Sequence, residues 1–505
     1  MCIKRCLLVL LLLVPMAAAA QYQGTDRPAQ DTTVVLTLDD ALKIALSENT
    51  SVKVADKEIE RQKYAQKGAY GALFPQINAS GMYSYAIQKQ KVFFGSDDDE
   101  EGSGGGGGGM ASMMASAFEP IMYYIQQLYM ATGTPFVPYV APEEDKPSSS
   151  SSDPIEMGRR NQVQLGLTAA MPIVNVQLWE SLRLTGDQVE LAVEQARESR
   201  LGTVTAVKQA YFAVLMAKAS YEVYNAVYEN AVQNYKLTEN RFNVKKASEM
   251  DMARAQSSLA AAIPNVFNAE NAIYLALWQL KAVMGVDLDR AVDVAGSLDD
   301  YAEHMFYDLN EGAESASLER NTQMIQLARQ AEMLAKQIRM QQYAYIPTLS
   351  MQVSYNYYTQ SDKFQLNQWK WLPSSTLVFS LNIPIFSGGQ RYHAIKQTRV
   401  QADELELQRQ NAERQLRIGI RQSLSTMDTS MKSYDAAAEA VKSAEKAYDI
   451  ASKSYQVGKS TLTDLNNVEL TLTQARLQAA QAIYNFVLAK ASLEQTLGYD
   501  FTEEK

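Results

Sequence analysis

The chain has 505 residues and a formal net charge of −10 at pH 7, from 47 Lys and Arg against 57 Asp and Glu. This acidity argues against a nucleic-acid partner, because nucleic acids attract basic surfaces. The only cysteines, Cys2 and Cys6, lie in a segment that we expect to be removed. The mature protein then has no cysteine, which excludes disulfides and thiolate chemistry.

Residues 1–20 are predicted to be a secretory signal peptide. Lys4 and Arg5 precede the apolar run Leu7–Val14, and an alanine-rich exit follows. Cleavage after this exit takes the net charge from −10 to −12, because both basic residues leave. The run is short for a membrane anchor, and Gln21 stands where a lipoprotein would need cysteine. No other stretch is long and apolar enough for a membrane helix.

A helix is predicted over 38–74, with Thr37 at its start and Pro75 at its end. A related segment lies 272 residues further on, where Pro347 corresponds to Pro75. After each proline, apolar and polar residues alternate with period two, which predicts strands at about 76–94 and about 348–358.

Two further strands are predicted to run toward prolines. Apolar residues alternate over 161–172, which ends at Pro172, and over about 375–383, which is followed by Pro384. Aromatic residues close to these strands fit a membrane interface belt. Four strands cannot close a barrel, and lipid does not tolerate open sheet edges, so several chains must share one barrel. Three chains would give twelve strands.

Two long helical hairpins are predicted at 176–284 and 390–497. Apolar residues advance by about 3.5 residues per step along each, which is typical of a coiled coil. Each outward helix is about 100 Å long and each return helix about 50 Å. Gly458 breaks the second hairpin at its turn. Pro264 is expected to kink the first return helix or break it locally.

The two halves match, which predicts an internal duplication. Tyr235 and Tyr448, like Asp251 and Asp464, stand 213 residues apart, and the apolar positions of the two return helices correspond throughout. The predicted domains are a first repeat at 21–287, an equatorial linker at 288–320 and a second repeat at 321–505.

Residues 95–160 are expected to form a flexible insert that is exposed outside the cell. It contains an acidic run, a glycine run and a serine run, with a methionine-rich segment at 110–130 between them. This segment fits an amphipathic helix that packs on the barrel rim or binds an outside partner. A methionine-based copper site is the weaker alternative.

The chain resembles the TolC family of outer-membrane efflux channels over almost the whole mature chain except the insert. The resemblance lies in the duplicated order of several short motifs. They are Leu73-Phe74-Pro75, Ile346-Pro347, Met171-Pro172-Ile173, Ile383-Pro384-Ile385-Phe386-Ser387-Gly388-Gly389, Arg241-Phe242-Asn243-Val244, Ser454-Tyr455-Gln456-Val457-Gly458, Met284-Gly285 and Leu497-Gly498.

The resemblance implies a mixed α and β membrane protein. Such proteins are homotrimers with a twelve-stranded barrel in outer-membrane lipid and a helical coiled-coil tunnel in the periplasm. Their hairpin tips meet a periplasmic adaptor, which links them to an inner-membrane pump, here expected to be of the resistance-nodulation-division type. The expected docking residues at the tips are Arg241, Phe242, Val244, Lys246, Val457, Gly458 and Lys459.

The resemblance also implies a periplasmic gate, formed here by Asp251, Tyr455 and Asp464. Ser460 and Asn467 stand where the family has an arginine and a second aspartate, so the gate is altered. Three copies of Asp464 around a threefold axis would form a negative ring that attracts cations. Alternatively, Asp464 only caps its helix, Tyr455 belongs to the coiled-coil seam, and Gly458 serves the turn.

The function expected is passive exit of small toxic molecules, such as drugs, from an inner-membrane pump. The alternative on the same fold is type I secretion of a protein or peptide from an ABC transporter, and a coiled-coil stalk or adhesin is more remote. An enzyme is not expected, because the two histidines, His304 and His393, are isolated and no catalytic set, metal site or cofactor motif is visible.

Overall fold

The computed structural model describes residues 34–92, 155–306 and 318–499, except residues 366 and 368. The expected signal peptide and residues 95–154 of the expected insert lie outside the described residues. The chain divides into two compact units. The described residues within Met1–Gln66, Arg183–Ile338 and Lys396–Lys505 form a helical unit, and those within Lys67–Leu182 and Arg339–Ile395 form a strand unit.

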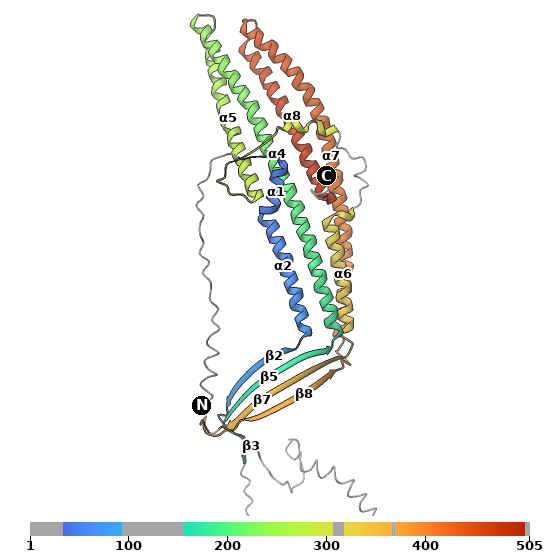
Figure 1. Ribbon diagram of the computed structural model, residues 1–505. Coiled ribbons are helices and arrows are strands. Elements are labelled where there is room, and N and C mark those ends of the chain that lie inside the picture. Colours follow the sequence, from blue (N-terminus) through green and yellow to red (C-terminus); the bar gives the residue numbers. More distant parts are fainter. Residues whose placement is uncertain (1–33, 93–154, 307–317, 366, 368, 500–505) are drawn as a thin grey trace, which may run out of the picture. The chain divides into compact units, whose positions relative to one another are not determined.

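Four antiparallel strands form the sheet of the strand unit, in the order β2-β5-β7-β8 (Figure 1). They are β2 (Gln76–Tyr85), β5 (Asn161–Val174), β7 (Thr348–Ser361) and β8 (Leu372–Asn382). A separate two-stranded sheet pairs β3 (Gln90–Val92) with β4 (Ile155–Met157). Because β2 and β8 have one partner each in the four-stranded sheet, each leaves an edge there.

The first strand is shorter than the sequence predicts. Instead of one strand over 76–94, β2 ends at Tyr85, and residues 86–89 separate it from β3. Ala86 and Ile87, which follow Tyr85, are both apolar, so the alternation breaks where β2 ends.

The sequence predicts that the strand over 161–172 ends at Pro172. In the structure Pro172 lies inside β5, which continues to Val174. The pairing of β5 with β7 shifts register between Pro172 and Val174. On its other side, β5 pairs with β2 only as far as Ala170, which is opposite Gln76. A proline is tolerated there because it lies at a bulge, beyond the end of the neighbouring strand.

The other three corner prolines lie outside the strands. Pro75 stands between the 3-10 turn η1 (Gly71–Leu73) and β2, and Pro347 immediately precedes β7. Pro384 follows β8, and its carbonyl oxygen accepts a hydrogen bond from Arg391, 3.1 Å away.

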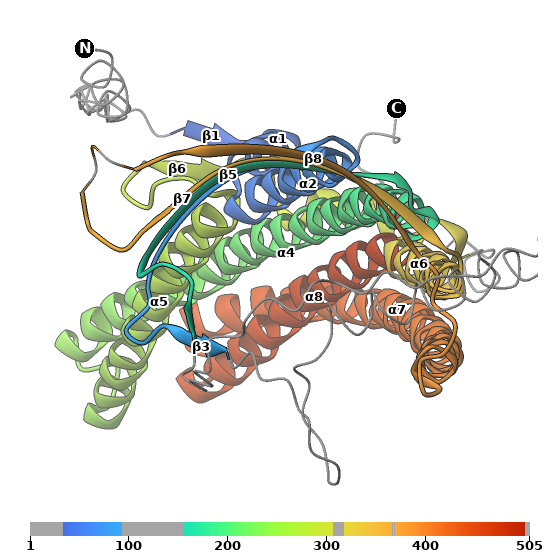
Figure 2. The same cartoon turned by 90° about the horizontal axis from the view of Figure 1, so that it is seen from below.

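Two long hairpins dominate the helical elements. The first joins α4 (Val176–Asn243) to α5 (Glu249–Met284), and the second joins α7 (Gln390–Gln456) to α8 (Leu462–Leu497). In both views α7 and α8 lie side by side (Figures 1 and 2). The helix α5 is continuous through Pro264, so of the two expected effects, a kink or a local break, the break is absent.

The helix predicted over 38–74 is divided into α1 (Leu38–Glu48) and α2 (Thr50–Tyr70), followed by η1. Asn49 causes the division, because its side chain serves both neighbours. Its amide nitrogen donates to the carbonyl of Val283 at 2.6 Å, and its amide oxygen accepts from the backbone of Ser51 at 2.7 Å. Asn49 therefore caps the start of α2 and ties this junction to the end of α5.

A hydrophobic core surrounds the middle of α4 and the end of α8. The parallel pair β1 (Val34–Leu36) and β6 (Val292–Val294) and the helix α1 contribute to it. Tyr211 of α4 is fully buried there and donates its hydroxyl to the carbonyl of Ala295 at 2.6 Å. The 3-10 turns η2 (Leu298–Tyr301), η3 (Glu303–Phe306) and η5 (Leu318–Arg320) complete the connection to α6 (Thr322–Tyr343).

Candidate functional site at the hairpin tips

Both hairpins reverse direction through the same backbone geometry. In the second, the backbone nitrogen of Gly458 donates to Tyr455 at 3.0 Å, and that of Lys459 donates to Ser454 at 2.8 Å. In the first hairpin, the backbone nitrogen of Lys245 donates to the carbonyl oxygen of Phe242, and that of Lys246 donates to the carbonyl oxygen of Arg241. This pair of bonds is the Schellman motif, which requires a left-handed residue after the helix.

The two tips place different residues at the left-handed position. Gly458 has a φ of 77° and Lys245 a φ of 59°, and Lys245 is the one residue other than glycine with a positive φ in the described chain. A side chain in this conformation costs about 1 kcal/mol or more, because its Cβ approaches the following carbonyl. The first tip is therefore strained where the second is not.

We expect Lys245→Gly to stabilise the first hairpin by about 1 kcal/mol, because glycine adopts this conformation without the Cβ contact. Thermal unfolding in detergent would measure the change. Lys246→Gly is the matched control, since it removes the same charge at a position without positive φ. Equal effects of the two substitutions would contradict the strain.

The two predicted gate aspartates each close a capping box. Asp251 accepts from the hydroxyl of Ser248 at 2.7 Å, and Asp464 accepts from that of Thr461 at 2.6 Å. In return, each hydroxyl accepts from the aspartate's own backbone nitrogen. These hydrogen bonds stabilise the ionised carboxylates and lower the pKa of both aspartates. Each acid therefore stays charged at the start of a return helix.

Tyr455, the third predicted gate residue, is buried between the two hairpins. Its hydroxyl lies 2.6 Å from the hydroxyl of Thr238, and both side chains are almost inaccessible to solvent. The guanidinium of Arg241 lies over the Tyr455 ring, 5.1 Å from its centre. It also donates to the backbone carbonyls of Tyr455 and Gln456. Arg241 thus satisfies carbonyl groups that the end of α7 would leave free.

We call Thr238, Arg241 and Tyr455 the tip cluster. The structure brings together two residues that the sequence predicts for different roles, Arg241 for docking and Tyr455 for the gate. Thr238 has no part in the sequence predictions. Its only signal is its place one turn before Phe242 on the outward helix.

Further contacts join the two return helices near the tips. Arg254 of α5 donates to the hydroxyl of Thr463 at 3.4 Å, and Asn466 of α8 donates to Ser258 at 2.8 Å. A small apolar cluster of Ala255, Tyr455, Leu462 and Leu465 lies beside them. The hairpins are therefore held together at their tips by a few polar contacts and a small core, a type of interface that can open at modest cost.

The predicted docking residues other than Arg241 are exposed at the turns. Phe242, Val244 and Val457 are large apolar side chains that point to solvent. Gly458, Lys246 and Lys459 are exposed beside them. Apolar groups between lysines form a surface suited to a protein partner with acidic and apolar groups.

A buried acid lies further along α8. Glu469 is only 8% exposed and accepts a hydrogen bond from the amide of Asn230 on α4 at 2.9 Å. Burial raises the pKa of Glu469, because the ionised form loses its hydration. A charged residue directly beside the apolar seam positions Leu465 and Leu472 is the sequence signal that would have revealed it.

We expect Glu469→Gln to raise thermal stability at about pH 7 and to change it little near pH 4. Because the pKa of Glu469 is higher in the native state than in the unfolded state, protonation of this residue stabilises the native state at low pH. This stabilisation is lost as the pH rises through the native pKa of Glu469. Glutamine keeps an acceptor for Asn230 without the charge. Glu439→Gln, at an exposed position, is the control. A gain independent of pH would contradict this explanation.

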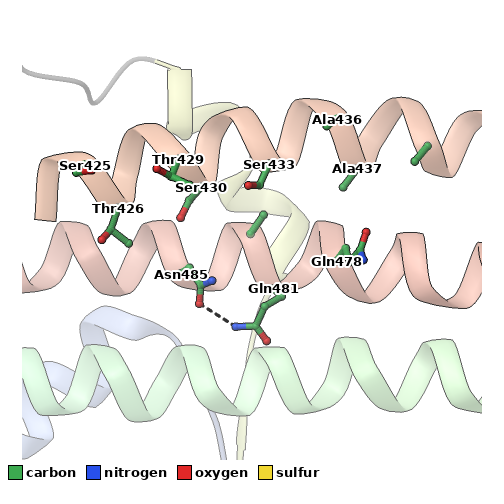
Figure 3. Close-up of a pocket in the computed structure, with 12 residues that line it drawn as sticks. Ser425, Thr426, Thr429, Ser430, Ser433, Ala436, Ala437, Gln478, Gln481 and Asn485 are labelled. Carbon is green, nitrogen blue, oxygen red and sulfur yellow. Dashed lines mark hydrogen bonds between the residues drawn. The ribbon is translucent and has the colours of Figure 1, made fainter. Parts of the chain in front are cut away.

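A polar groove runs between α7 and α8 (Figure 3), with a cavity volume of about 620 Å³. Small and polar side chains line it, and Gln481 donates to Asn485 within it at 2.8 Å. It contains no set of acid, base and nucleophile. The groove is a water-accessible surface without catalytic groups.

The four-stranded sheet has one apolar and one polar face. The register aligns Leu165 with Tyr357 and Val353 with Leu377, so alternate positions of all four strands bring apolar side chains to one face. The apolar residues Ile77, Tyr83, Leu165, Leu167, Val353, Tyr355, Tyr357, Leu377, Phe379 and Leu381 are all exposed on that face. An apolar surface this large marks an interaction with lipid or another chain. Within the described part of the chain, each helix is too short or too polar to cross a membrane.

Comparisons with known proteins identify the class. The family model described as "Outer membrane efflux protein" matches residues 125–286 and 314–499. Since these ranges make up more than half of the sequence, the chain belongs to the outer membrane efflux protein family. The resemblance noted from the sequence motifs is confirmed. Proteins of this family are channels, so this chain is not an enzyme.

Individual relatives agree with this assignment. Outer membrane protein TolC of Escherichia coli (strain K12) is 23% identical over 354 residues, which cover 67% of this chain and 70% of that protein. Outer membrane protein TolC of Salmonella enteritidis is 22% identical over 347 residues, with coverage of 67% and 69%.

Solved structures share the fold. The CmeC outer membrane channel of Campylobacter jejuni has a TM-score of 0.64 at 16% identity and covers 91% of this chain and 85% of its own. The open state of the MtrE outer membrane channel of Neisseria gonorrhoeae has a TM-score of 0.63 at 14% identity, with coverage of 91% and 88%. The mixed helix and strand fold predicted from the sequence is therefore that of outer membrane channels.

Proposed function

We propose that this chain forms the outer-membrane exit duct of a tripartite efflux system for small toxic molecules such as drugs. Membership of the outer membrane efflux protein family carries the proposal. In this proposal a cleaved signal peptide at 1–20 exports the chain, the sheet lies in outer-membrane lipid, and the helices lie in the periplasm. The 95–160 insert is then exposed outside the cell.

The sheet supports a homotrimer with a shared twelve-stranded barrel. Each chain contributes four strands, and the edges at β2 and β8 need partners if the sheet lies in lipid. Pairing β8 of one copy with β2 of the next closes a ring and leaves no edge. The apolar face then meets lipid, and the polar face lines the lumen.

Paired contacts support the proposed duplication into 21–287 and 321–505, joined by 288–320. Asn49 donates to Val283, and Asn321 donates to Thr496 at the corresponding position. Ser248 and Thr461 cap the two return helices in the same way. In a trimer, the duplicated hairpins give a ring of nearly equivalent units around the tunnel.

The proposed gate consists of Asp251, Tyr455 and Asp464. The two aspartates stay charged because of their capping boxes, and three copies of each would form negative rings that favour cations. Tyr455 serves the gate by holding the hairpins together through the tip cluster. Opening then requires the loss of its contacts with Thr238 and Arg241.

The exposed tip residues are proposed to dock a periplasmic adaptor, which connects the duct to an inner-membrane pump of the resistance-nodulation-division type. Phe242, Val244 and Val457 would supply apolar contact, with Lys246 and Lys459 steering the adaptor. Arg241 is less exposed, and its hydrogen bonds to Tyr455 and Gln456 support the shape of the tip.

The proposal is tested by removing the protein from its native cells and measuring retention of a fluorescent efflux dye. Cells without it should retain the dye, and expression of the wild-type chain should restore efflux. Purified protein should be a trimer by native mass spectrometry and should conduct ions across a planar bilayer. Unchanged dye efflux combined with loss of one secreted polypeptide would contradict drug efflux and favour type I secretion. A non-conducting monomer would contradict both.

A further inference from the structure

Charged pairs join α4 to α6. Lys336 on α6 lies 2.6 Å from Asp187 on α4, and Arg329 lies 3.3 Å from Glu190. One turn further along, Gln326 donates to Glu198 at 2.7 Å. These contacts follow one stripe along each helix, because the residues on α6 are seven and three apart and those on α4 are three and eight apart.

The helix α4 has a second neighbour in α2. Arg200 of α4 forms an ion pair with Asp56 of α2 at 2.7 Å, and Gly186 lies against the side chain of Gln66. Both figures show α6 beside α7 (Figures 1 and 2). The helices of one copy thus follow the order α2, α4, α6, α7, with α2 and α7 at the two ends.

The two end helices, α2 and α7, are the repeat equivalents of the two inner helices, α6 and α4. Residues of α2 match those of α6 at a distance of 272, and residues of α7 match those of α4 at a distance of 213. The match extends to contacts, because Lys57 pairs with Glu60 at 2.7 Å just as Arg329 pairs with Glu332 at 3.0 Å. The stripe by which α6 contacts α4 therefore has a counterpart on α2.

Both counterpart stripes are exposed and carry large apolar residues. On α2, Val54 and Tyr64 are 62% and 63% exposed. On α7, Val400 and Leu407 are 54% and 66% exposed. Isolated exposed apolar residues are ordinary, but the equivalents of Val54, Tyr64 and Val400 are residues that join α4 to α6 through a hydrogen bond or an ion pair.

When the contacts between α6 and α4 are mapped onto the corresponding residues of α2 and α7, opposite charges again face each other. Arg329 corresponds to Lys57 and Glu190 to Asp403, so the ion pair becomes Lys57 with Asp403. Lys336 corresponds to Tyr64 and Asp187 to Val400, so that ion pair becomes an apolar contact. Asp403 has no ion-pair partner within the described part of the chain.

We propose that the exposed stripe of α2 in one copy packs against the exposed stripe of α7 in the next copy, with Lys57 paired to Asp403 and Tyr64 packed on Val400. The occupant of each stripe is a second copy of this chain. The inference rests on the proposed trimer and adds the surface and the register that assemble it. Repeated around a threefold axis, this contact closes the ring of helices.

Cross-linking tests the register directly. The full chain carries Lys57→Cys and Asp403→Cys, in a background with Cys2→Ala and Cys6→Ala, and membranes are treated with a short bismaleimide. We expect a covalent trimer on a denaturing gel. Each single variant should give only monomer. A bismaleimide is used because helices joined by long charged side chains lie too far apart for a disulfide.

Two further double-cysteine variants serve as controls for the yield of cross-linked trimer. Glu190→Cys with Arg329→Cys reproduces the known contact, so it should cross-link within one chain and leave a monomer. Lys63→Cys with Asp403→Cys moves one cysteine off the proposed stripe, and we expect at least a tenfold lower yield of covalent trimer.

Charge reversal gives an independent measurement. Lys57→Asp should reduce the yield of native trimer, and addition of Asp403→Lys should restore it. A native trimer without cross-linking between Lys57→Cys and Asp403→Cys, or with equal cross-linking from Lys63→Cys, would overturn the proposed register and leave the proposed function intact. Absence of a native trimer in the wild-type protein would overturn both.

Discussion

Gly498→Ala is expected to disrupt the junction between the end of α8 and η5 and to reduce the accumulation of folded protein several-fold. Gly498 ends α8 with a φ of 75°, and a Cβ there would overlap the backbone carbonyl of Arg320. The left-handed conformation costs about 1 kcal/mol, and overlap with backbone adds about 1–3 kcal/mol. Folded protein in the outer membrane, measured by resistance to trypsin, should fall several-fold.

Gly202→Ala is the matched control for this substitution. Gly202 lies inside α4, has no positive φ, and a Cβ there would meet only the end of the flexible Gln495 side chain, at 3.9 Å. This change should stabilise the helix by about 0.5–1 kcal/mol. Equal behaviour of the two variants would contradict the close approach at the junction. Gly285, which lies against the carbonyl of Glu48, should behave like Gly498.

Arg241→Ala is expected to release the tip cluster and shift the duct toward an open state. The substitution removes a charged donor from the carbonyls of Tyr455 and Gln456, and a cation from the Tyr455 ring. Charged hydrogen bonds of this kind contribute about 1.5–3 kcal/mol, which corresponds to a shift in the opening equilibrium of about tenfold or more. Single-channel recording in a planar bilayer would measure the open probability.

Tyr455→Phe separates the hydroxyl from the ring. It removes only the contact with Thr238, worth about 1 kcal/mol, and keeps the ring beneath Arg241. We expect a smaller increase in open probability than with Arg241→Ala. Lys459→Ala, at an exposed position of the same turn, should leave conductance unchanged. An Arg241→Ala channel that opens no more often than wild type would show that the tip cluster does not restrain the duct.

The long periodic elements of this fold are readable from the sequence. Seams that repeat about every 3.5 residues identify the helical hairpins, because such patterns persist over many turns. The interruptions of these elements depend on contacts with distant parts of the chain. Asn49 divides a helix because its side chain reaches Val283, more than two hundred residues away in sequence. Pro172 stays inside β5 because the neighbouring strand ends before it.

At the hairpin tips, too, local patterns can be predicted from the sequence and contacts between distant residues cannot. The capping boxes of Asp251 and Asp464 lie within four consecutive residues, so a local pattern is enough to predict the caps. The tip cluster joins α4 to α7 across more than two hundred residues, and no spacing in the sequence indicates that Thr238 meets Tyr455. The roles of these residues as gate and docking surface remain predictions.

The most direct test of the proposed duct is photo-cross-linking from the tips in intact cells. A photoreactive residue replaces Lys459 or Lys246, and the captured protein is identified by mass spectrometry. The proposal predicts capture of a periplasmic adaptor that belongs to a resistance-nodulation-division pump. Capture of an adaptor of an ABC transporter would contradict drug efflux, and no capture at either tip, with the trimer present in the outer membrane, would contradict docking at these residues.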